Sequence, residues 1–98
     1  MNKYTDKEIK IKLKSVFWDH NITSEDLFGI FTGKKKNVGS VNRVIIYYRL
    51  LNSYDWYTLL KMVPSGKWKE MLSDPVLENL FPKSLKKKYS YARRVLYG

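Results

Sequence analysis

Along most of the chain, apolar residues recur three and four positions apart, the spacing that places them on one face of an α-helix. Residues that favour a helix N-cap precede these stretches, at Thr5, Ser24, Ser40, Ser53 and Asp74. Residues that end helices follow them, at Gly33, Pro64 and Pro82. The pattern predicts an all-α fold, a compact single-domain bundle of about five to seven short helices that takes up residues 1–98.

The first helical stretch also fits a strand. Ile9, Ile11 and Leu13 alternate with lysines, which is the pattern of a half-exposed β-strand. Thr5 and Glu8 have the spacing of a capping box, in which each side chain binds the backbone N–H of the other residue. We therefore favour a helix for this segment and keep the strand as the alternative.

Two neighbouring segments in the middle of the chain differ in polarity. Residues 33–39 contain two glycines and three consecutive lysines, which predicts an exposed loop. From Ser40 to about Asn52 the chain is mostly apolar and leaves little polar face. This second segment is therefore expected to form a central, mostly buried helix.

The central helix carries two arginines, Arg43 and Arg49. Charged side chains are rarely buried without a partner of opposite charge. We expect each arginine to form an ion pair, and Asp19 and Asp55 are the candidate acceptors.

The last predicted helix, from Lys83 to Tyr97, is amphipathic. The residues that share its apolar face, which we expect to pack on the core, are Leu85, Tyr89, Ala92 and Leu96. The remaining surface carries six Lys and Arg residues and no acidic residue, whereas an ordinary solvated face mixes both signs. Tyr91 and Tyr97 flank the basic stripe; we expect them to cover the hydrophobic edge, with stacking on bases as the alternative.

Composition narrows the class of protein. The 98 residues are 44% hydrophobic, which is too apolar for a disordered charged segment, and the net charge of +10 indicates a polyanionic partner. No cysteine is present, which fits a reducing compartment, and we expect a cytoplasmic protein. The N-terminal stretch lacks the apolar run of a signal peptide, and no apolar run approaches the roughly 20 residues that span a bilayer.

Catalytic and cofactor-binding patterns are not found in the sequence. His20 is the only histidine, and without cysteine it makes a zinc site improbable. No nucleophile, acid–base pair or phosphate loop stands out, so we expect a non-enzymatic protein without cofactor or metal. Residues 55–73 weakly match a helix-turn-helix, but the second helix lacks the side chains that commonly read base edges.

The charge pattern predicts a binding surface made by the triple-lysine loop beside the basic face of the last helix. The expected contact residues are Lys34, Lys35, Lys36, Lys83, Lys86, Lys87, Arg93 and Arg94. The main hypothesis is a binding module that contacts the phosphates of DNA or RNA. The alternative is a subunit that docks on an acidic partner protein, and membrane binding is not expected.

Three stretches together resemble a known family: Val16–Asp19; Arg49–Leu51 with Asp55–Trp56 and Leu59–Leu60; and Lys83–Tyr89 with Tyr91. The family consists of small bacterial helical proteins, often encoded beside nucleotidyltransferase-like genes of the abortive-infection toxin type. The resemblance covers most of residues 13–97. It implies a helical accessory or antitoxin-like role, with binding to its own promoter, to the nucleotidyltransferase-like partner enzyme, or to both, and it supplies no catalytic residues.

Overall fold

Seven α-helices account for most of residues 3–98, the part of the chain that the computed structural model describes, and confirm the all-α prediction. The helices are α1 (Asp6–Ser15), α2 (Ser24–Thr32), α3 (Arg43–Ser53), α4 (Trp56–Met62), α5 (Trp68–Met71), α6 (Asp74–Leu77) and α7 (Lys83–Tyr97). The shorter elements are the 3-10 helix η1 (Ser65–Lys67) and the strands β1 (Asn37–Val38) and β2 (Val41–Asn42).

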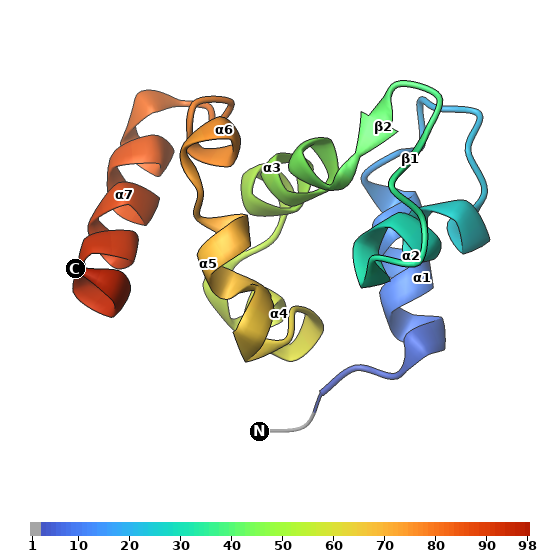
Figure 1. Ribbon diagram of the computed structural model, residues 1–98, viewed down its shortest axis with the longest axis horizontal. Helices are drawn as coiled ribbons and strands as arrows, with labels where there is room; N and C mark the ends of the chain where they lie inside the picture. Colours follow the sequence, from blue (N-terminus) through green and yellow to red (C-terminus); the bar gives the residue numbers. More distant parts are fainter. Residues whose placement is uncertain (1–2) are drawn as a thin grey trace.

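Helix α3 crosses the middle of the molecule (Figure 1). The pair α1 and α2, with the short hairpin, lies at one end of the long axis, and α6 and α7 lie at the other. Helices α4 and α5 lie below α3 in this view. The buried hydrophobic residues form one continuous cluster, so a single core connects the two ends.

The capping box at the start of α1 is present. The Thr5 hydroxyl accepts a hydrogen bond from the Glu8 backbone N–H at 3.2 Å, and the Glu8 carboxylate accepts one from the Thr5 N–H at 2.9 Å. Ile9 and Leu13 are buried, whereas Ile11 between them is exposed, because i and i+4 share a helix face. The strand alternative for this segment is therefore wrong.

The stretch expected to be only a loop contains a small β-hairpin. Gly33 ends α2 in the left-handed conformation, with φ of 87°, and β1 then pairs antiparallel with β2. Gly39 occupies the tight turn with φ of 60°, a conformation that side chains rarely adopt. Strands of two residues are too short for an alternating pattern, so the sequence gives no signal for them.

Several helices begin one or two residues away from the predicted cap. The N-caps of α2, α3, α4 and α6 are Thr23, Asn42, Asp55 and Ser73, where the pattern favours Ser24, Ser40, Ser53 and Asp74. In each case a second residue suited to capping lies close by in the sequence. The sequence therefore locates these helix starts to within two residues.

Tyr47 on α3 lies in the core, where it is almost completely buried. Burial, with the charge of Glu70 as a smaller cause, raises the pKa of Tyr47 from 10.0 to about 12. The fold therefore favours the neutral phenol. The stability that this contributes is complete below pH 10 and is lost as the pH rises from 10 to about 12.

Tyr47→Phe is accordingly expected to reduce the alkaline loss of stability. The urea concentration at the unfolding midpoint should fall between about pH 9 and about pH 11.5 in both chains. The fall should be larger for the parent chain, because the phenylalanine of the variant has no proton to lose. Equal falls in the two chains would contradict this role of Tyr47.

Candidate polyanion-binding surface

Four cationic side chains line one groove along α7. The groove has a volume of about 480 Å³ and is lined by Lys83, Lys86, Lys87, Ser90, Tyr91 and Arg94. Their spacing of three and four residues places them on one side of the helix. Within residues 3–98, none of the four cations has an ion-pair partner. We call this groove the basic groove.

The packing of α7 on the core explains why this face is exposed. Tyr89 is buried, and its ring centre lies 6.2 Å from that of Trp56 on α4. Leu85 and Ala92, on the same side of α7, are half-buried. Because this side contacts the core, the opposite side with the four cations faces solvent.

Arg93 lies outside the basic groove and forms contacts within the protein, although its side chain is still 38% exposed; its role as a contact for the polyanion stays a prediction. Its guanidinium donates a hydrogen bond to the Leu72 carbonyl at 3.3 Å and pairs with the Asp74 carboxylate. These contacts attach α7 to the segment that begins α6. Arg93 is therefore an anchor of the helix that carries the basic groove.

Lys35 is likewise engaged within the protein. Its ammonium pairs with Asp26 on α2 and holds the pKa of that carboxyl below its usual range. Its backbone N–H donates to the Gly29 carbonyl at 3.0 Å, and its side-chain stem lies close over Gly29. Of the three loop lysines, only Lys34 and Lys36 have no ion-pair partner within the described residues.

The two predicted basic patches do not form one surface. The loop 34–36 joins α2 to β1 at one end of the molecule, and α7 lies at the other end (Figure 1). The molecule measures 35 Å along its longest axis. The expectation that the loop lies beside the helix face is therefore wrong, and the two patches are separate.

The weak helix-turn-helix match also fails. Helix α5 has only four residues, and two of them, Trp68 and Met71, are buried. A third, Glu70, forms an ion pair with Arg43 of α3. Only Lys69 remains exposed, so α5 has no side-chain row that could read a DNA groove.

Lys69 instead extends the basic surface of α7, a role that sequence reasoning missed. A second groove, of about 330 Å³, is lined by Lys69, Ser90, Arg93, Arg94, Tyr97 and Gly98. Ser90 and Arg94 line both this groove and the basic groove. The contribution of Lys69 depends on α5 lying against the end of α7, which no local sequence pattern predicts.

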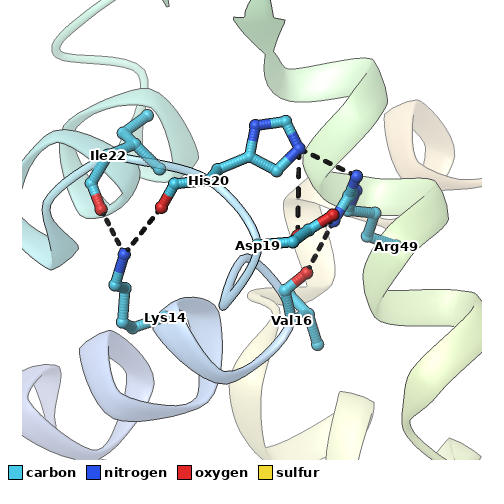
Figure 2. Close-up of polar contacts among 6 residues, drawn as sticks. All are labelled: Lys14, Val16, Asp19, His20, Ile22 and Arg49. Atoms are coloured by element: carbon cyan, nitrogen blue, oxygen red, sulfur yellow. Dashed lines mark hydrogen bonds and ion pairs between the residues drawn. The ribbon is translucent and has the colours of Figure 1, made fainter.

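The lone histidine has a structural environment (Figure 2). The Nε2 atom of His20 lies 2.9 Å from Nη2 of Arg49. The Nη1 atom of Arg49 donates hydrogen bonds to the Val16 carbonyl at 2.9 Å and to the Asp19 carboxylate at 3.1 Å. The guanidinium also stacks on the Phe17 ring at 4.7 Å from its centre. The contacts join the turn after α1 to α3, so His20 supports the fold.

The ion pairs of the central arginines were predicted in part. Asp19 is the partner of Arg49, as expected, and the guanidinium holds the pKa of this carboxyl below its usual range. Arg43 pairs with Glu70 and not with Asp55. Asp55 accepts the Thr58 backbone N–H at 2.9 Å as the N-cap of α4. A carboxylate at a helix start can either cap the helix or pair with a cation, and Asp55 caps α4.

A further groove, of about 600 Å³, lies along α1 and α2 and includes the exposed Trp18. Two of its three lysines are engaged within the protein. Lys10 pairs with Glu25 at 2.9 Å, and Lys14 donates to the carbonyls of His20 and Ile22. This groove therefore offers much less free positive charge than the basic groove.

Over residues 3–98, no three His, Asp or Glu side chains gather where they could hold a metal ion. The same residues include no helix with the length and apolar character needed to cross a membrane. No protein-family model matches the chain, and no curated protein or solved structure matches it either. The resemblance to the accessory proteins of nucleotidyltransferase-like toxins therefore stays a prediction.

Proposed function

We propose that the protein is a non-enzymatic module that binds the phosphate backbone of nucleic acids through the basic groove of α7. The observation that supports this most directly is the set of four exposed cations, Lys83, Lys86, Lys87 and Arg94, without an ion-pair partner in the described chain. Nearby acidic side chains usually neutralise such a face. Here α7 has none, so the groove attracts polyanions.

The length of the basic groove suits a nucleic-acid backbone. From Lys83 to Arg94 the helix rises about 16 Å, at 1.5 Å per residue. Phosphates of one DNA strand follow each other about every 3.4 Å along the duplex axis. The groove therefore extends over about four to five phosphates, a number similar to that of its cations.

A second candidate is a subunit that docks on an acidic partner protein. The observation in its favour is the exposed apolar surface next to the cations, formed by Tyr91, Val95 and Leu96. Aromatic and apolar residues of this kind are common anchors at protein interfaces. An antitoxin-like or regulatory role, with a nucleotidyltransferase-like enzyme as the partner, rests on the family resemblance alone.

The salt dependence of binding tests the proposed function. If the four cations of the basic groove neutralise about four phosphates, the logarithm of affinity should fall with the logarithm of salt concentration, with a slope of roughly −3 for a single strand and roughly −4 for a duplex. A fluorescence-anisotropy titration of a labelled DNA oligonucleotide at several salt concentrations gives this slope. No binding at low salt, or a slope near zero, would exclude the proposal.

A further inference from the structure

A third groove on α7 adjoins the basic groove and is mostly apolar. It has a volume of about 310 Å³ and is lined by Trp56, Lys88, Tyr89, Tyr91, Ala92, Val95 and Leu96. Tyr91 lines both this apolar groove and the basic groove. The tyrosine therefore stands at the boundary between a cationic surface and an apolar one.

The apolar side chains at this end of α7 face solvent. Tyr91 is 66% exposed, Val95 65% and Leu96 51%. The sequence predicts that Leu96 packs on the core, and this expectation is wrong, because half of the side chain is exposed. Tyr91 lies at the hydrophobic edge, as expected, but it leaves much of the neighbouring apolar surface exposed. Beyond Ala92 this face of α7 is not covered by the core, so its side chains are available to a ligand.

We propose that α7 binds single-stranded nucleic acid, with phosphates in the basic groove and unpaired bases against Tyr91 and in the apolar groove. This inference rests on the proposed function and adds the strand state of the ligand. Proteins that bind single strands combine a cationic groove for the backbone with exposed aromatic rings on which bases stack. In a duplex the base faces are stacked on each other and cannot reach Tyr91.

The position of the apolar groove beside the basic groove favours bases over a helix of a partner protein. From Lys88 to Leu96, the part of α7 that lines this groove, the helix rises about 12 Å, which is room for three or four stacked bases. Because Tyr91 lines both grooves, a single strand can place its phosphates in the basic groove and its bases in the apolar groove, whereas the apolar face of a partner helix would use the apolar groove alone. A second copy of α7 is disfavoured, since each copy brings six cations and no carboxylate to the contact.

The test compares a labelled DNA strand of about 12 nucleotides with a duplex of the same length at one salt concentration. We expect the strand to bind at least about tenfold more tightly than the duplex. Tyr91→Ala should weaken strand binding by about tenfold through loss of stacking, and Tyr91→Phe should retain it. Binding of the duplex should change little in either variant.

Tyr57→Ala serves as the matched control, because Tyr57 is an exposed tyrosine on α4 that lines neither groove. Equal affinity for strand and duplex, or equal effects of Tyr91→Ala and Tyr57→Ala, would overturn the inference. In either case, the affinities for the single strand and for the duplex would still fall with salt concentration if the proposed function holds, so the two proposals can fail separately. An acidic amphipathic peptide that binds more tightly than the strand would overturn the inference in favour of a protein partner.

Discussion

Reversing the charges of Lys86, Lys87 and Arg94 to glutamate together is expected to weaken nucleic-acid binding by at least about 100-fold. Each lost phosphate contact contributes about 1 kcal/mol or more, and each new carboxylate repels the backbone. The three side chains are exposed and have no ion-pair partner within the described residues, so the fold should persist. Anisotropy titrations at fixed salt measure the affinity, and circular dichroism checks the fold.

The matched control reverses three other exposed lysines, Lys7, Lys34 and Lys36, which lie on α1 and the loop at the far end of the molecule. Both triple variants have the same net charge, so long-range attraction changes equally and only the location differs. We expect the control to lose less than about fivefold in affinity. Similar losses in the two variants would show that binding depends on overall charge and not on the basic groove.

Arg49→Ala is expected to destabilise the protein by about 3 kcal/mol, which lowers Tm by more than about 10 °C. The variant loses the hydrogen bond to the Val16 carbonyl, the contact with His20 and the stacking on Phe17. These contacts hold the turn after α1 against α3 (Figure 2). Thermal unfolding followed by circular dichroism gives the change.

Arg49→Lys separates charge from geometry in the same experiment. A lysine keeps a positive charge near Asp19, but a single ammonium cannot replace the planar fork that reaches Val16, Asp19 and His20 together. We therefore expect it to recover only a small part of the loss. Arg94→Ala, which removes an exposed arginine without an ion-pair partner in residues 3–98, should change stability by less than about 0.5 kcal/mol. A Tm for Arg49→Ala close to that of Arg94→Ala would contradict the structural role.

Local signals in the sequence account for most of the helical framework. The capping box at Thr5, the glycine that ends α2 and the proline after α4 each act within a few residues, so a pattern can reveal them. The full extent of α7, from Lys83 to Tyr97, is also as predicted, since Pro82 precedes an unbroken amphipathic pattern.

The candidate site was harder to predict because it depends on contacts between distant segments. The partner of Arg43 is 27 residues away, at Glu70, and that of Arg93 lies on α6. These pairings decide which cations remain free, and no local pattern encodes them. The exposure of the apolar face at the end of α7 also depends on distant segments. Periodicity shows that a helix face is apolar, but the length of the neighbouring elements decides how much of that face is covered.

The central claim is that a polyanion contacts α7 and not the triple-lysine loop. Nuclear magnetic resonance of the isotope-labelled protein, titrated with an unlabelled DNA strand of about 12 nucleotides, tests it residue by residue. We predict that the largest shifts fall on backbone amides between Lys83 and Tyr97, with little change at residues 34–36. Shifts confined to residues 34–36, or spread evenly over the surface, would contradict the claim.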